Sequence, residues 1–337
     1  MHSNLSKFKR LLLIAFVAVV LSACTSGGGD TAFNGNLSDL AGMKAPPRSI
    51  KDILLIFEQT KHDKSLLEKV TQVLALPVPT TSDPKVLNNY YYRRANAEEV
   101  MGNAEAAVVN FKKGVEDYPS TELELRIDEL NWYANAERAR GNLFQANKIL
   151  EGAIQQAMKA GGPNEGYAAS METAISTNCI NLGDIECAKN ALDRAESIFQ
   201  RISGRRIDFR HRLLHNSLLE FRRAAIFIAE GKYSEAEPLM RRALKLNAEL
   251  IESIKNSGQG DALDTEFRVA QDARNNSKPQ YRFRVGMQVL MSRIFLEQHR
   301  LVDAEYWARQ AVMLAISRDG VESPATVHSI GILTEVV

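Results

Sequence analysis

Two histidines provide the first candidate for metal chemistry in this sequence. His211 and His215 lie four residues apart, a spacing that places both imidazoles on one face of a helix, where they could hold a metal ion. The residues between them are Arg-Leu-Leu, so the glutamate that a zinc protease carries inside its histidine pair is absent. Arg210 and Arg212 would also repel a cation. We therefore expect no metal site.

Other patterns of catalytic residues are missing from the sequence. No serine, histidine and aspartate group has a recognisable nucleophile context, and neither a phosphate-binding loop nor a dinucleotide-binding glycine fingerprint occurs. The sequence predicts that the protein is not an enzyme, requires no cofactor and takes no small-molecule substrate.

Cys179 and Cys187 lie eight residues apart on either side of Gly183. In an oxidising compartment they could form a disulfide bridge, which requires Cα atoms within about 7 Å. The alternative is that both are small buried side chains in a helical hairpin. The spacing does not fit a metal pair.

The N-terminal segment has the features of a bacterial export signal. Lys7, Lys9 and Arg10 precede an apolar run from Leu11 to Leu21, which is too short to span a bilayer as a helix. The sequence Leu21-Ser22-Ala23-Cys24 resembles the lipobox of bacterial lipoproteins. That resemblance implies cleavage before Cys24 and acylation of its thiol and new amino terminus, which would anchor the chain stably in a membrane. Thr25, in place of an aspartate, favours the outer membrane, facing the periplasm.

The charge of the remaining chain is nearly balanced. Removal of residues 1–23 takes away three basic residues, which leaves 39 basic and 41 acidic residues. Such a balance gives no reason to expect a nucleic-acid partner. One basic cluster, formed by Arg201, Arg205, Arg206, Arg210 and Arg212, could meet lipid phosphates or an acidic partner, or could simply be a solvated segment.

A spacing pattern recurs along most of the chain and indicates the elements that position these residues. A small residue lies seven before a glycine, and an alanine, a bulky apolar residue and another small residue follow at five, nine and twelve after it. The copies are Ala95/Gly102/Ala107/Phe111/Gly114, Ala134/Gly141/Ala146/Leu150/Ala153, Ser176/Gly183/Ala188/Leu192/Ala195, Ala224/Gly231/Ala236/Met240/Ala243 and, in degenerate form, Ser292/His299/Ala304/Ala308/Ala311. Each copy predicts two helices joined by a tight turn, packed closely where the small residues cross.

These hairpins resemble tetratricopeptide (TPR) repeats, and the copy from Asn88 to Pro119 ends on the family's terminal proline. The resemblance implies an all-α fold, a TPR-like α-solenoid of stacked hairpins. Successive turn positions are 39, 42, 48 and 68 residues apart, longer than the standard period of about 34. The family's tryptophan and tyrosine positions are mostly unmatched.

The chain is therefore expected to consist of a signal peptide (1–23), a lipidated flexible tether (24–48), N-terminal capping helices (49–83) and a repeat array (84–337) of about five hairpins plus one terminal helix. Predicted helices in the array span residues 84–101, 104–117, 121–140, 142–159, 165–182, 184–201, 206–230, 233–255, 281–298, 301–318 and 323–337, with a loop and short helix between 256 and 280.

In TPR arrays the first helix of each hairpin lines a concave groove. Carried over by spacing from Gly102 and Gly141, the groove should contain the candidate partner-binding residues Tyr92, Asn96, Glu99, Asn131, Asn135 and Arg138. Asn96 and Asn135 match positions where family members often bond a ligand's backbone. At the same offsets from Gly231 the residues are apolar, which predicts that a helix or neighbouring repeat covers them. Since residues 90–92 are consecutive tyrosines, at least one is expected to be exposed.

The fold and the export signal together predict a non-catalytic, membrane-anchored scaffold that binds other envelope proteins or peptides through its groove. The alternative is a sensing part of a protease system, because Ile50 to Gly102 and the Ser323-Pro324-Ala325-Thr326 segment resemble TPR arrays that precede caspase-like CHAT domains.

Overall fold

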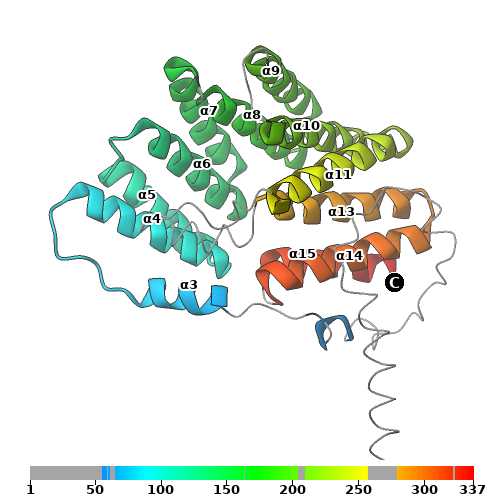
Figure 1. Ribbon diagram of the computed structural model, residues 1–337, viewed down its shortest axis with the longest axis horizontal. Coiled ribbons are helices and arrows are strands. Elements are labelled where there is room, and N and C mark those ends of the chain that lie inside the picture. Colours follow the sequence, from blue (N-terminus) through cyan, green and yellow to red (C-terminus); the bar gives the residue numbers. More distant parts are fainter. Residues whose placement is uncertain are drawn as a thin grey trace, which may run out of the picture. The chain divides into compact units, whose positions relative to one another are not determined.

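The computed structural model describes residues 55–58, 60, 65–162, 164–203, 209–256, 279–321 and 323–337 (Figure 1). The signal peptide, Cys24 and the tether fall outside this range, as do Arg205, Arg206 and the short helix predicted between residues 256 and 280. The described residues form helices and contain no strand, so the all-α prediction is confirmed for this part of the chain.

Every helix predicted after Pro84 within the described ranges is present, and its ends differ from the prediction by no more than three residues when the α-helix Ala104–Lys112 is taken together with the π-helical turn Lys113–Asp117 that continues it. The helices are α3 (Ser65–Ala75), α4 (Pro84–Val100), α5 (Ala104–Lys112), the π-helical turn η2 (Lys113–Asp117), α6 (Leu123–Ala139), α7 (Leu143–Ala160), α8 (Asn164–Asn181), α9 (Ile185–Ser203), α10 (Phe209–Ala229), α11 (Tyr233–Asn256), α13 (Pro279–Glu297), α14 (Leu301–Asp319) and α15 (Pro324–Val336).

The turn positions of the spacing pattern have the backbone conformation that the pattern implies. Gly102, Gly141, Gly183 and Gly231 have φ between 74° and 87°, a left-handed conformation that glycine adopts without steric cost. In the degenerate copy His299 takes the same role with φ 59°, and among the described residues it is the only non-glycine with positive φ.

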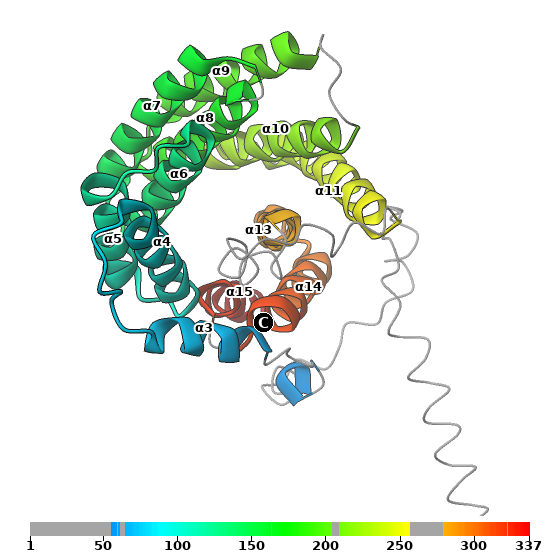
Figure 2. The same ribbon diagram turned by 60° about the vertical axis from the view of Figure 1, so that its left-hand side comes forward.

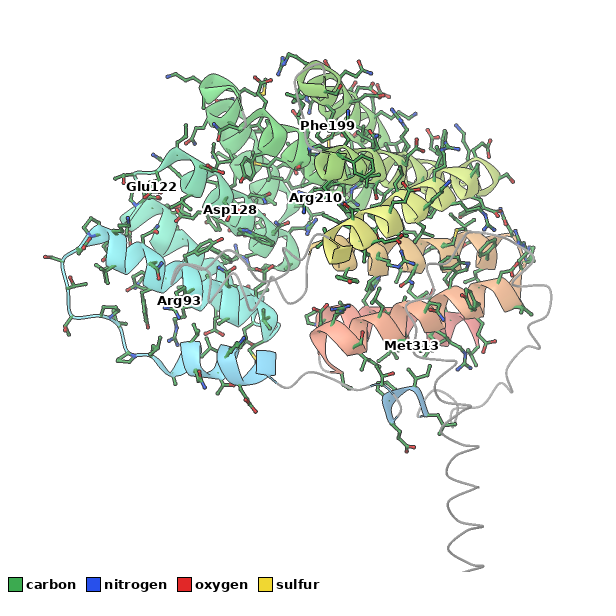
Figure 3. The ribbon with its side chains drawn as sticks, viewed as in Figure 1. Arg93, Glu122, Asp128, Phe199, Arg210 and Met313 are labelled. Carbon is green, nitrogen blue, oxygen red and sulfur yellow. A yellow bond between two sulfur atoms is a disulfide. The ribbon has the colours of Figure 1, made fainter. Side chains whose placement is uncertain are left out.

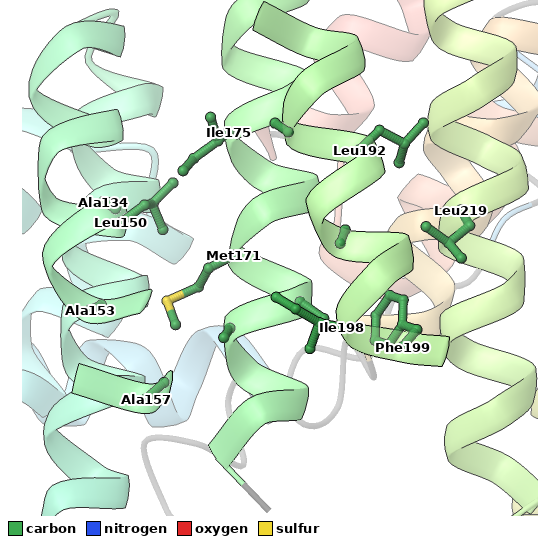
Figure 4. Close-up of a cluster of buried hydrophobic side chains, with 14 of the residues drawn as sticks. Ala134, Leu150, Ala153, Ala157, Met171, Ile175, Leu192, Ile198, Phe199 and Leu219 are labelled. Carbon is green, nitrogen blue, oxygen red and sulfur yellow. The ribbon is translucent and has the colours of Figure 1, made fainter. Parts of the chain in front are cut away.

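The small and apolar residues of the pattern are buried where the two helices of each hairpin cross. Within each hairpin the two helices pack against each other, and α5, α7, α9 and α11 also pack against the helix that follows. Figure 4 shows the largest described cluster, in which Leu150 and Met171 lie between α7 and α8, and Leu192 and Phe199 extend the core toward α10. Close helix approach at alanine therefore repeats from hairpin to hairpin.

Figure 2 shows α4, α6, α8 and α10 on the inner side of this series of helices and α5, α7 and α9 on the outer side. Helix α13 packs on α10, and a Cβ atom placed on Gly286 would lie 3.3 Å from Cζ of Phe221. Glycine at this position therefore lets the two helices approach closely. As predicted, a helix covers apolar residues of α10.

Candidate functional site

Tyr92 and Asn96, two of the predicted groove residues on α4, are buried instead of lining an open surface. Their exposed fractions are 4% and 1%. Tyr92 packs edge-on against Phe111, and the Asn96 side chain donates a hydrogen bond to the Tyr92 carbonyl oxygen at 2.8 Å. Helix α6 lies close enough to α4 for Asp128 to bond the Tyr92 hydroxyl. The expectation that both face a groove was wrong.

The expectation that one of the three tyrosines is exposed was also wrong, because α4 is covered on three sides. The Tyr90 hydroxyl donates to the carbonyl oxygen of Leu76 at 3.2 Å, beyond the end of α3. Tyr91 stacks on Tyr118 with ring centroids 5.7 Å apart. Tyr92 faces α5 and α6, so consecutive residues that diverge around the helix each meet a different neighbour.

A carboxylate on α6 joins the first two hairpins. The hydroxyl of Tyr92 donates to Oδ2 of Asp128 at 2.8 Å, and the indole of Trp132 donates to Oδ1 at 3.1 Å. Burial raises the pKa of Asp128 above its ordinary value, although both hydrogen bonds act in the opposite direction. Figure 3 labels Asp128 on α6. This network orders the start of the inner side of α6.

Asn131, Asn135 and Arg138, predicted as groove residues, lie along one stripe of α6 and are half-buried. The side-chain amides of Asn131 and Asn135 make no hydrogen bond within the described part of the chain. On α8, which packs against both α6 and α10, one half-buried stripe contains the small residues Ser170, Ala174 and Thr177, and Tyr167 at its start donates to Oε1 of Glu124 at 3.1 Å. The positive charge of Arg138 repels the guanidinium of Arg222 on α10 and contributes to lowering its pKa. We call the surface formed by Asn131, Asn135, Arg138, Ser170, Ala174, Thr177 and Arg222 the inner face.

The sequence interpretation missed Trp132 and Arg222. Both lie nine residues before their turn glycine, Gly141 and Gly231, a position that the pattern did not use. Arg222 was overlooked as a candidate binding residue because its neighbours at the groove offsets, such as Phe221 and Ala225, are apolar and indicated a hydrophobic stripe. The presence of a charged residue next to an otherwise apolar stripe could have identified Arg222 as a candidate.

Glu99 lies apart from the inner face, in a cavity of about 450 Å³. The lining comes from the turn between α4 and α5, the end of α6, α13 and the start of α15, and includes Val285, Val289 and Pro324. The Pro324 ring also approaches Gly102, where an added Cβ would lie 3.5 Å from Cγ of Pro324. Of the six predicted partner-binding residues, three thus share one surface, two are buried, and Glu99 lines a separate cavity.

The cysteines and histidines lie in different surroundings. Cys179 and Cys187 have Cα atoms 5.8 Å apart, within the range that a disulfide requires, and their sulfur atoms are at bonding distance. His215 is buried, with its ring centroid 3.9 Å from that of Phe199. Within the described ranges, no group of three or more histidine, cysteine, aspartate or glutamate side chains is arranged to hold a metal ion.

Arg201 and Arg210 of the basic cluster also have defined positions. Arg201 pairs with Glu165 at 3.0 Å, so part of the cluster's charge is compensated by a neighbouring helix. Arg210 lies near the start of α10 (Figure 3).

No family model matches the chain, and no curated protein is significantly similar to it. In the part of the chain that the structure describes, no helix is both long and apolar enough to cross a membrane. The inner face and the N-terminal segment are therefore the features of the chain that bear on its function.

Proposed function

We propose that this protein is a non-catalytic scaffold that holds a segment of a partner polypeptide on its inner face. The paired helices and their repeating glycine turns favour a TPR-like α-solenoid, a class of fold that presents binding residues from the inner helices of consecutive hairpins. The proposed partner is another protein or peptide of the bacterial envelope.

The observation that carries this proposal is the contrast between α4 and α6. Asn96 on α4 is buried and bonded within its own helix, whereas the equivalent Asn135 on α6 is half-buried and its amide makes no hydrogen bond in the described part of the chain. An asparagine amide can donate to one backbone carbonyl and accept from one backbone N–H. Asn131 and Asn135, one helical turn apart, could thus bind the backbone of an extended or helical segment.

Removal of both amides tests this proposal. Asn131→Ala/Asn135→Ala should weaken capture of envelope partners at least about tenfold, as expected when well-placed hydrogen bonds at an interface centre are lost. Helicity and melting temperature should change little, because neither amide is bonded within the described chain. Phe144→Ala is the matched control, since Phe144 is 77% exposed on the outer helix α7. Equal capture by the double variant and the wild type would contradict the proposal.

We further propose that Cys24 anchors the scaffold in the membrane, with the outer membrane as the favoured location. Support comes from the lipobox-like sequence Leu21-Ser22-Ala23-Cys24 after a basic and apolar segment. Cys24→Ser should leave an uncleaved precursor that incorporates no labelled fatty acid. Cleavage and labelling identical to those of the wild type would contradict the anchor without affecting the proposal for the inner face.

A further inference from the structure

Arg222 is a cation without a counterion in the described part of the chain. Its Nε is buried and donates no hydrogen bond, and none of the described carboxylates forms an ion pair with it. The guanidinium lies over the ring of Phe221, 4.6 Å from the centroid. Such a cation–π contact attracts the guanidinium to the ring but does not neutralise its charge.

Other arginines on inner and outer helices have carboxylate partners. Arg194 forms two hydrogen bonds with Glu172, each 2.9 Å long, and Arg309 bonds Glu305 at 2.8 Å. A buried charge is unfavourable unless it is paired, because the protein interior solvates it less well than water does. Arg222 therefore differs from Arg194 and Arg309.

The second arginine of the inner face, Arg138, acts on Arg222 through its positive charge. Burial lowers the pKa of Arg222 to about 9, and the positive charge of Arg138 contributes in the same direction. At neutral pH the guanidinium remains charged. An anion bound near Arg222 would offset both the unfavourable burial of its charge and the repulsion from Arg138.

A carboxylate is the anion that best matches the two arginines. Helix α8 packs against both α6 and α10, and Ser170, Ala174 and Thr177 are small half-buried residues on it. Guanidinium groups bind carboxylates through paired hydrogen bonds, which makes a carboxylate the anion that best fits their geometry.

We propose that Arg222, together with Arg138, binds an aspartate or glutamate side chain of the partner polypeptide. This inference rests on the proposed function and assigns a chemical class to the partner: a segment that is acidic at one point. A run of negative charge does not fit the surface, because Asp128 lies on the same side of α6 as Arg138 and would repel it. Asn131 and Asn135, between these two charges, would face uncharged residues of the segment.

Two fluorescent peptides of serine, alanine and asparagine provide the test, one with a central pair of glutamates and the other with glutamines in their place. Fluorescence anisotropy with the full chain measures the affinity for each peptide, and inorganic phosphate at matched ionic strength reports on binding of a small anion. The variants are Arg222→Gln and, as a matched control, Arg242→Gln, because Arg242 is exposed on α11 and paired with Glu220 at 3.1 Å. Circular dichroism and thermal melting check that both variants fold.

We expect the glutamate peptide to bind the wild type at least about tenfold more tightly than the glutamine peptide, since hydrogen bonds to charged groups have this magnitude. Arg222→Gln should abolish the preference, and Arg242→Gln should retain it. Equal affinities, no binding of either peptide, or a preference that survives Arg222→Gln would overturn the carboxylate site. Binding of phosphate without a preference between peptides would assign the arginines to a small anion, which overturns the peptide partner.

The failure of this inference can be distinguished from a failure of the proposed function. If Asn131→Ala/Asn135→Ala loses its partners while the two peptides bind equally, the scaffold proposal stands and the carboxylate site does not. If the double variant keeps every partner while the glutamate peptide binds through Arg222, the carboxylate site stands and the proposed role of the two asparagines does not.

Discussion

The hydroxyl of Tyr92 donates a 2.8 Å hydrogen bond to Oδ2 of Asp128 and thereby joins α4, in the first hairpin, to α6, in the second. Because Trp132 donates to the other carboxylate oxygen, Asp128 has a partner on each side. Tyr92 is therefore a structural residue that couples two hairpins, and the proposed partner-binding surface begins beyond it on α6.

Tyr92→Phe should destabilise the chain by about 1.5–3 kcal/mol, because a hydrogen bond to a charged group is lost and a buried carboxylate loses one of its donors. Partner capture should not change. The free energy of unfolding from urea titration measures the effect. Tyr118→Phe is the control, since Tyr118 stacks on Tyr91 and its hydroxyl has no hydrogen bond in the described part of the chain. Equal stability of the two variants would contradict the role given to Tyr92.

Glu129, next to Asp128, should make the stability depend on pH. Burial raises the pKa of Glu129 to about 7 from an ordinary value of 4.5, and the negative charge of Asp128 acts in the same direction. The folded protein thus binds a proton that the unfolded chain releases, and this stabilising contribution is complete below pH 4.5 and disappears as the pH rises through 7. Glu129→Gln should match the wild type near pH 4.5 and be more stable at pH 8, by up to about 3 kcal/mol.

Unfolding measured in urea at both pH values tests the prediction for Glu129. Glu235→Gln is a suitable control, because Glu235 lies exposed in the first turn of α11. A stability difference between Glu129→Gln and the wild type that is independent of pH would rule out the proposed titration.

His299 provides a test of the turn geometry. Its φ of 59° is unfavourable for a residue with a Cβ, whereas the corresponding positions in the other copies are glycine. His299→Gly should therefore stabilise the chain by about 0.5–1 kcal/mol. Gly141→Ala is the reverse exchange and should destabilise by about 1–2 kcal/mol through conformation alone, because nothing lies within 4 Å of an added Cβ. Thermal melts in which both variants shift in the same direction would contradict this account.

The sequence predicted the helices after Pro84 because the pattern combines two independent signals. Glycine marks each turn, and alanine at fixed offsets marks each helix crossing, as Ala107 and Ala146 illustrate. Burial around α4 was predicted less well. Periodicity shows which face a residue lies on, but it does not show that α6 approaches closely enough for Tyr92 to bond Asp128, since that contact links residues 36 positions apart.

The inner face was predicted only in part for a similar reason. Asn131, Asn135 and Arg138 follow from their spacing before Gly141. Arg222 is a candidate because none of the carboxylates in the described part of the chain pairs with it. Sequence offsets identify the helix position of a charged residue, whereas its pairing depends on side chains contributed by other helices.

Site-specific photo-crosslinking tests the central claim most directly. A benzophenone amino acid at position 135, on the inner face, and at position 144, on the outer helix α7, would be irradiated in living cells that express the full chain. We predict that position 135 yields a crosslink to a defined partner and position 144 does not, and that the crosslinked peptide contains an acidic residue. Crosslinks from position 144 with none from position 135 would contradict the account, because the partner would then bind the outer helices.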